Sequence, residues 1–183
     1  TSIDGLEVRR TGRTSRTSHF RNHVLDERQQ HLIEDLSGTF SGEVRCDELA
    51  LAMYSTDASV FQVKPLGVAF PKHREDVVAL ARYATEMKLP LIPRGAGSNV
   101  NGAALGRGLI VDFSRHMNAI GAVDNNTVTV QSGVVLERLN AVLRPLGKYF
   151  PADPSNPAST TIGGMLGVDA AGSRAVRIGS TRD

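Results

Sequence analysis

The 183-residue chain has no tryptophan, one cysteine and few aromatic residues, and each scarcity excludes a class of protein. With Cys46 alone, the chain cannot form an internal disulfide, a cysteine-based zinc site or an iron–sulfur cluster from its own residues. An aromatic content of 5% argues against a stacking platform for single-stranded nucleic acid. A chain this poor in cysteine fits a reduced, intracellular compartment. We therefore expect a cytoplasmic protein, with a peripheral position at a membrane as the alternative.

Strong net charge and long apolar runs are also missing. The formal net charge is +2 at pH 7, which is too small to indicate a polyanionic partner, so we expect no nucleic acid. No apolar run approaches the roughly 20 residues that a membrane-spanning helix needs, so we expect no membrane span. Residues 1–23 hold five arginines among serines and threonines. We interpret them as a flexible basic tail, with a nucleic-acid arm or an organelle transit segment as alternatives.

The rest of the chain alternates between helical and strand patterns. Helices are expected at residues 24–38, 47–55, 72–88 and 135–147, and strands at residues 67–71, 89–93, 108–115 and 127–133. Asp47 is the expected N-cap of the second helix, and Asn125 and Asn126 form a turn before the last strand. One apolar face is expected on the third helix, formed by Val77, Leu80, Ala81, Ala84 and Met87. Residues 67–93 are thus predicted to form a β–α–β unit. Residue 93 then lies near the carboxyl end of a strand, where α/β proteins bind ligands.

The segment PRGAGSNVNGAALGRG, residues 93–108, holds five glycines and only two large apolar residues. Glycine lets a ligand touch the backbone, and it permits turns whose N–H groups converge on an anion. The segment is neither a Walker motif nor a dinucleotide fingerprint, because it lacks Gly-Lys-Ser/Thr and leads into a strand. We predict that it grips a phosphate-bearing cofactor; a loose surface turn is the alternative. The candidate residues are Arg94, Gly95, Ala96, Gly97, Ser98, Asn99 and Gly102.

A second glycine-rich segment, TIGGMLGVDAAG at residues 161–172, follows a proline-rich loop. Small residues at this spacing let a bulky, flat ligand lie against the start of a helix. Tight helix packing without a ligand is the alternative. One ligand held by both segments is a simpler explanation than two unrelated features.

These two motifs, with the strand and helix between them, resemble the FAD-binding domain of the FAD-linked oxidases. That family includes the D-lactate dehydrogenases, the glycolate oxidase flavin subunit, the D-2-hydroxyglutarate dehydrogenases and the vanillyl-alcohol oxidases. The resemblance covers roughly Leu32 to Asp183. Residues 42–78 look most similar to large bacterial members in which the flavin domain is fused to an iron–sulfur domain.

The resemblance implies an α+β fold: a PCMH-type FAD-binding domain of two α/β subdomains, truncated before its C-terminal part. We expect the first subdomain at about residues 24–115 and the start of the second at about residues 116–183. The catalytic residues would lie beyond Asp183, so none is assigned, and the chain alone is expected to be inactive. The five histidines are scattered, and we expect surface or packing roles for them and no metal site.

The resemblance also implies which residues contact FAD. The pyrophosphate would lie on residues 94–99 and Gly102. Further contacts would come from Asp153, Pro154, Thr161, Gly163, Gly164, Asp169, Ala170, Ala171 and Gly172. Ala96 replaces a glycine that is frequent in the family, and Asp169 replaces a frequent asparagine, so we expect its carboxylate to point away or to contact a sugar hydroxyl. Some members attach FAD through a histidine at the position of Ser98, and we therefore expect non-covalent FAD.

The implied reaction is oxidation of a D-2-hydroxy acid, such as D-lactate, glycolate or D-2-hydroxyglutarate, by hydride transfer to the flavin. The electrons would pass to an iron–sulfur domain or a quinone, and any iron–sulfur cluster would belong to a part of the protein outside this chain. Two alternatives stay open: an FAD oxidase of the same fold with another substrate class, and a non-catalytic scaffold. Tyr54 and Asp57 could approach the flavin, although a helix-capping role is the expectation for Asp57.

Overall fold

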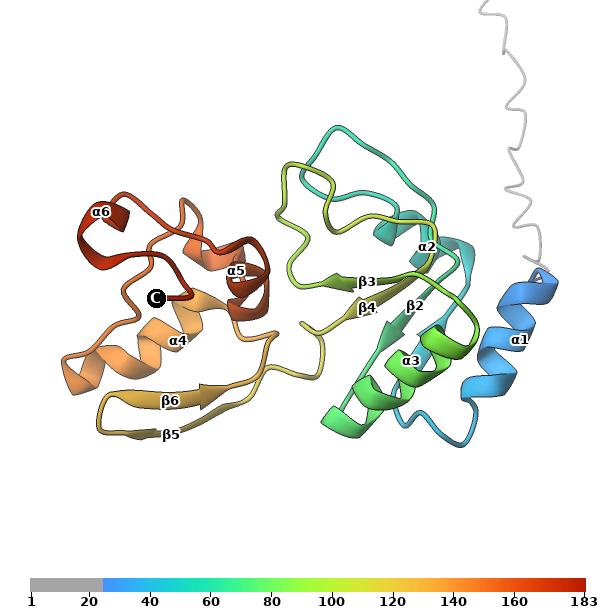
Figure 1. Ribbon diagram of the computed structural model, residues 1–183, viewed down its shortest axis with the longest axis horizontal. Helices are drawn as coiled ribbons and strands as arrows, with labels where there is room; N and C mark the ends of the chain where they lie inside the picture. The colour runs from blue at the N-terminus through green and yellow to red at the C-terminus, as the bar shows by residue number, and fades with distance from the viewer. Residues whose placement is uncertain (1–24) are drawn as a thin grey trace, which may run out of the picture.

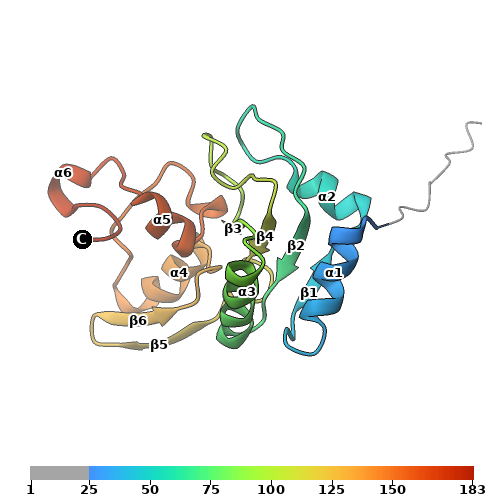
Figure 2. The ribbon, with the colours of Figure 1, turned by 45° about the vertical axis from the view of Figure 1, so that its right-hand side comes forward.

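The computed structural model describes residues 25–183, so the predicted basic tail at residues 1–23 lies outside the described residues. Figures 1 and 2 show two units side by side, each with its own sheet. This mixture of helices and sheets agrees with the predicted α+β class. The division near residue 115 stays a prediction. None of the helices between residues 25 and 183 is both long and apolar enough to cross a membrane.

The first unit is built around a four-stranded sheet in the order β1–β2–β4–β3. Strands β2 (Gly67–Phe70), β4 (Leu109–Asp112) and β3 (Leu91–Arg94) run parallel, and β1 (Glu43–Arg45) pairs antiparallel with β2. Every residue of β2 and β4 is buried, as expected for strands covered on both faces. The three strands predicted in this unit are therefore confirmed, and β1 was not predicted.

Helices cover both faces of this sheet. On one face, α1 (Glu27–Leu36) and α3 (Arg74–Glu86) pack Leu32, Leu36 and Leu80 against β2 and β4. On the other face, Tyr54 at the end of α2 (Glu48–Tyr54) packs against residues of β2, β3 and β4. The Asp47 side chain accepts a hydrogen bond from the Ala50 N–H at 3.1 Å, which confirms the predicted N-cap.

The predicted apolar face of α3 is only partly correct. Leu80 and Ala84 are buried and Val77 is half-buried, but Ala81 and Met87 are exposed. The helix ends at Glu86, so Met87 lies at its C-terminus beyond the region that packs on the sheet.

The second unit is a hairpin covered by short helices. Strands β5 (Ile120–Asp124) and β6 (Thr127–Val130) are antiparallel and joined by the predicted asparagine turn, in which Asn125 has a positive φ of 48°. Helix α4 (Leu136–Leu143) and helix α5 (Ile162–Val168) pack their apolar side chains together over the hairpin. The other elements are two 3-10 helices, η1 (Arg144–Leu146) and η2 (Pro157–Ser159), and the unpredicted helix α6 (Ala175–Ile178).

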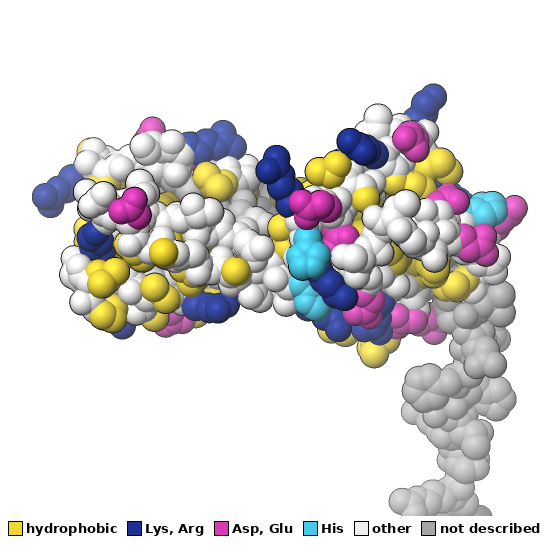
Figure 3. Space-filling model, turned by 90° about the horizontal axis from the view of Figure 1, so that it is seen from below, with side chains coloured by type: hydrophobic (Ala, Val, Ile, Leu, Met, Phe, Trp, Pro, Cys, Tyr) yellow, Lys and Arg dark blue, Asp and Glu magenta, His cyan; other side chains and the backbone are white. Residues whose placement is uncertain are grey.

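Charged side chains of both signs are intermixed on the underside of the first unit (Figure 3). This distribution matches the small net charge of +2. That face therefore presents no large field of one sign.

Candidate functional site

The first glycine-rich segment is the connection between two parallel neighbours, β3 and β4. Such strands are usually joined through a helix, but residues 95–108 contain none. The loop instead folds on itself, because Asn99 Oδ1 accepts hydrogen bonds from the N–H groups of Asn101 (2.7 Å) and Ala103 (3.1 Å). Gly97 and Gly102 have positive φ values of 67° and 77°, which other residues rarely adopt. These contacts argue against a loose surface turn.

The backbone N–H groups of the loop form an unpaired run. Within residues 25–183, none of the consecutive N–H groups from Gly95 to Val100 donates to a protein acceptor. Backbone donors are strong and seek partners in water or in a ligand. Successive free donors around glycines are typical of a backbone nest that binds an anion. The loop thus offers the donors that a pyrophosphate needs.

Arg94 lies beneath this loop. Its guanidinium carbon is 5.0 Å from the centre of the Tyr54 ring, and its Nη1 donates to the Ala104 carbonyl oxygen at 3.4 Å. A Cβ added to Gly97 would lie 2.6 Å from Arg94 Nη2, so any other residue at this turn would displace the guanidinium from this position. The side chain therefore braces the loop from below.

Tyr54 is held in turn by a buried carboxylate. Its hydroxyl donates to Asp112 Oδ2, and Asp112 Oδ1 accepts from the N–H and the hydroxyl of Ser114, both at 2.7 Å. Burial raises the pKa of Tyr54, and the hydrogen bond to Asp112 and the charge of that carboxylate raise it further. Sequence reasoning missed Asp112, although an aspartate that ends the apolar run LIVD is a recognisable signal.

Asp57 is not a helix cap, because no helix begins near it, and that expectation was wrong. Its Oδ1 accepts from the Ser59 N–H at 2.8 Å, while its buried Oδ2 has no partner among the described residues. Burial alone would raise the pKa of Asp57, but hydrogen bonding to Ser59 and the charge of Arg94 lower it overall. The Ala58 N–H donates to the Gly97 carbonyl at 3.0 Å. The segment after α2 therefore lies against the glycine loop.

The second glycine-rich segment forms α5 and the chain after it. The Thr161 Oγ1 accepts from the Gly164 N–H at 3.3 Å and caps the helix. The N–H groups of Ile162 and Gly163 donate to the carbonyls of Val134 and Ser132, both at 2.8 Å. The first turn of α5 therefore has no backbone donor left for a phosphate. A Cβ on Gly163 would lie 2.7 Å from the Ser132 Cβ, which supports close packing as the reason for this glycine.

The two glycine-rich segments meet at one point. A Cβ added to Gly95 would lie 2.1 Å from Thr161 Oγ1, so the start of the loop and the cap of α5 are in close contact. Thr161 is buried, with 2% of its surface exposed. This contact joins the two units and places both predicted motifs beside one another.

Of the remaining predicted residues, Asp153 and Pro154 lie before α5, and residues 169–172 follow it. A Cβ on Gly172 would lie 2.1 Å from the Asp153 carbonyl oxygen, and Arg174 forms an ion pair with Asp153 at 3.5 Å. Asp169 ends α5 with a φ of 51°, and its Oδ1 accepts from the Ser180 hydroxyl (2.7 Å) and the Arg182 N–H (3.1 Å). An asparagine is well suited to this left-handed position. The Asp169 carboxylate is therefore engaged by the chain itself.

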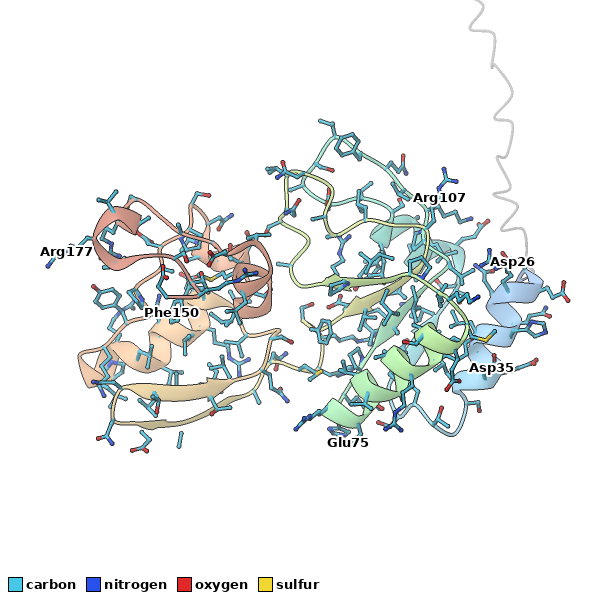
Figure 4. The ribbon with its side chains drawn as sticks, viewed as in Figure 1. Asp26, Asp35, Glu75, Arg107, Phe150 and Arg177 are labelled. Atoms are coloured by element: carbon cyan, nitrogen blue, oxygen red, sulfur yellow. The ribbon has the colours of Figure 1, made fainter. Side chains whose placement is uncertain are left out.

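Two hollows on the surface of the first unit contain none of the predicted binding residues. One, of about 500 Å³, is lined by residues including Asp26 and Arg107. The other, of about 690 Å³, is lined by residues including Asp35 and Glu75, and Figure 4 labels all four side chains. The candidate site is thus the open surface of the glycine loop rather than either hollow.

Comparison with known proteins shows the family of the chain. The family described as FAD binding domain matches residues 65–183. A D-2-hydroxyglutarate dehydrogenase of Pantoea ananatis is 39% identical over 149 residues, which are 79% of this chain and 15% of that protein. The glycolate oxidase subunit GlcD of Bacillus subtilis is 33% identical over 135 residues, which are 71% of this chain and 29% of that protein. The chain thus spans less than a third of the curated relatives that it matches.

Solved structures confirm the fold. A structure of alkyldihydroxyacetonephosphate synthase superposes with a TM-score of 0.71 at 24% identity, over 82% of this chain and 32% of that one. At this identity the likeness concerns the fold alone, and it is the predicted PCMH-type fold. The match to the family over residues 65–183 and the relatives that are 33–39% identical show that this chain belongs to the FAD-linked oxidases and carries their FAD-binding domain.

Proposed function

We propose that this chain holds FAD non-covalently and forms the cofactor-binding part of an enzyme that oxidises a D-2-hydroxy acid. The observation that carries the proposal is the run of free N–H groups from Gly95 to Val100, which lies over the cationic side chain of Arg94. A site of this kind suits the negative charge of a pyrophosphate. A hydrogen bond to a charged group contributes about 1.5–3 kcal/mol, so two or three such bonds would anchor the cofactor.

The residues divide into three roles. The backbone of Gly95, Ala96, Gly97, Ser98 and Asn99 would donate to the pyrophosphate, with Gly102 shaping the turn. The Arg94 guanidinium would attract the pyrophosphate through its positive charge, and it would hold the loop in place from below. Asp153, Pro154, Ala170 and Ala171, with Gly164 on α5, would contact the flat parts of the cofactor. Gly163 and Gly172 would act indirectly, because their missing side chains let the backbone pack against Ser132 and Asp153.

The names of the relatives support the substrate class. The proteins that match at 37–39% identity are D-2-hydroxyglutarate dehydrogenases, and a glycolate oxidase subunit matches at 33%. Bound FAD supplies the acceptor for the hydride that leaves C2 of the hydroxy acid. An iron–sulfur domain or a quinone would then take the electrons. The groups that bind substrate and remove its hydroxyl proton are assigned to no residue of this chain.

A visible absorption spectrum of the purified full-length protein, with the released cofactor identified by mass, tests this proposal. We expect a flavin spectrum, FAD that is released on denaturation, and bleaching by one D-2-hydroxy acid but not by its L enantiomer where one exists. FAD that stays on the denatured chain would overturn the non-covalent assignment alone. A colourless protein that takes up no added FAD would favour the scaffold alternative. Bound FAD that no hydroxy acid bleaches would favour another substrate class.

A further inference from the structure

We propose that Tyr54 and Arg94 form a clamp that holds the glycine loop in its anion-binding conformation, with Tyr54 as a positioning residue. The clamp consists of the Tyr54 ring and the Arg94 guanidinium, and the Asp112 carboxylate accepts a hydrogen bond from the Tyr54 hydroxyl. Tyr54 precedes residue 65, where the match to the family begins, so the match assigns it no role. The part of the proposal that concerns FAD rests on the proposed function.

The guanidinium of Arg94 lies between the Tyr54 ring and the loop. The ring is on one side, at 5.0 Å from the guanidinium carbon to the ring centre. On the loop side, Nη1 donates to the Ala104 carbonyl, and the missing side chain of Gly97 leaves space for Nη2. A guanidinium is planar and stacks on aromatic faces, which a lysine ammonium does not do in the same way. The position of the loop therefore depends on where the ring holds the guanidinium.

The Tyr54 ring is itself fixed on two sides. Its hydroxyl is bonded to Asp112 Oδ2, and its edge meets the Phe70 ring at a centroid distance of 5.8 Å and an interplanar angle of 79°. Asp112 is 5% exposed and anchored by Ser114. Rigid elements thus set the ring, since Tyr54 ends α2 while Phe70 and Asp112 belong to β2 and β4.

The clamp also balances charge beneath the anion site. Arg94 and Asp112 are paired residues in the register of β3 and β4, and the charge of Arg94 acts on Asp57 as well. Two carboxylates below the loop would repel a pyrophosphate if no cation lay between them and the ligand. Arg94 offsets them from its place under the loop. If the Arg94 guanidinium moved away from the Tyr54 ring, it would no longer lie between the two carboxylates and the ligand.

Three substitutions and a control separate the clamp from general destabilisation. Tyr54→Leu removes the ring, whereas Tyr54→Phe keeps the ring and removes only the bond to Asp112. Arg94→Lys keeps the charge and removes the planar group. The control is Tyr83→Leu on α3, where the tyrosine hydroxyl donates to Asp35 at 3.1 Å and the ring packs on the face of the sheet opposite Tyr54. Two quantities are measured for each protein: the Kd for FAD, and hydrogen exchange of the loop amides of Asn101, Ala103 and Leu105 without cofactor.

We expect Tyr54→Leu and Arg94→Lys each to raise the Kd for FAD at least tenfold and to speed exchange of the three loop amides at least tenfold. Tyr54→Phe loses stability to urea, yet both quantities should stay within threefold of the wild type, and the same holds for Tyr83→Leu. An FAD affinity that follows stability across all four variants would overturn the clamp. Unchanged hydrogen exchange of the loop amides in Tyr54→Leu would also overturn it. If Tyr54→Leu does not fold, unchanged exchange in Arg94→Lys would do the same.

The two readouts keep the clamp and the proposed function apart. A wild-type protein that binds no FAD would refute the proposed function and the cofactor part of this inference. The exchange rates of the cofactor-free loop would still decide whether Tyr54 and Arg94 hold it.

Discussion

Gly97 and Gly147 have nearly the same positive φ, 67° and 68°, but different surroundings. A Cβ on Gly97 would meet Arg94, whereas a Cβ on Gly147 would meet nothing within 4 Å. An alanine at either position pays for the left-handed conformation with about 1 kcal/mol of unfolding free energy. We therefore predict a loss of about 1 kcal/mol for Gly147→Ala and at least that loss for Gly97→Ala in urea unfolding, and a Kd for FAD raised at least tenfold in Gly97→Ala alone.

Gly147→Ala is the matched control for backbone strain. If both variants weaken FAD binding equally, the effect comes from stability and not from the loop. If neither does, the pyrophosphate does not lie on Gly97.

The glycines also show what residue types alone can predict about the site. From the sequence, a glycine is interpreted as room for a ligand because it has no side chain. Both glycine-rich segments, residues 93–108 and 161–172, are predicted to bind the cofactor on this ground. In the structure, all six predicted glycines face protein atoms, and three of them meet residues of other segments closely: Gly95 meets Thr161, Gly163 meets Ser132, and Gly172 meets Asp153. These contacts join residues far apart in the chain, so no local pattern could distinguish them from ligand contacts. Whether a backbone N–H group is free can likewise be decided only from the structure, because the position of every possible acceptor must be known.

At the scale of elements, Asp76 ties the start of α3 to the segment before β1. Its carboxylate accepts hydrogen bonds from the N–H groups of Ser41 (2.7 Å), Lys72 (2.8 Å) and His73 (3.2 Å). Burial alone would raise the pKa of Asp76, but these hydrogen bonds lower it overall. We predict that Asp76→Ala costs about 2–3 kcal/mol of unfolding free energy at pH 7, because it leaves several donors unpaired.

The pH dependence follows from the direction of the shift. A carboxyl whose pKa is lower in the folded state stabilises above the unfolded pKa, near 3.9, and that contribution is lost as pH falls through the folded pKa. The difference in unfolding free energy between the wild type and Asp76→Ala, measured by urea unfolding, should therefore become smaller below about pH 4. The control is Glu75→Ala, an exposed residue of the same helical turn, which we expect to change stability by less than about 0.5 kcal/mol. A difference that persists unchanged at pH 3 would contradict the carboxylate argument.

Elements with a strong local pattern could be predicted, and those fixed by their neighbours could not. The apolar runs of β2 and β4 and the periodicity of α3 lie in the sequence itself. Strand β1 has three half-buried residues and exists because β2 offers it an edge. Helix α6 is a single turn of four residues, too short for helical periodicity to register. Local patterns likewise do not predict the strand order of the sheet, in which β4 lies between β2 and β3.

At the scale of the molecule, the contact between Gly95 and Thr161 couples the two units. An added Cβ at Gly95 would overlap Thr161 Oγ1 at 2.1 Å, and overpacking of this kind costs about 1–3 kcal/mol. Thr161→Ala alone removes the cap of α5, at a cost of about 1 kcal/mol. Because the second change removes the atom with which the first collides, we predict that the double variant is at least about 1 kcal/mol more stable than the sum of the single effects.

Urea unfolding of the two single variants and the double variant measures this coupling. Gly95→Ala combined with Thr85→Ala is the control, because Thr85 is an exposed residue of α3, and those effects should add within about 0.5 kcal/mol. Relief of the overlap should also recover part of the FAD affinity that Gly95→Ala loses, since the free N–H groups begin at Gly95. Recovery of stability without recovery of affinity would mean that the cofactor needs the Thr161 side chain itself. Strict additivity in both quantities would mean that the loop and α5 are not in contact in solution, and that one ligand does not bridge the two units there.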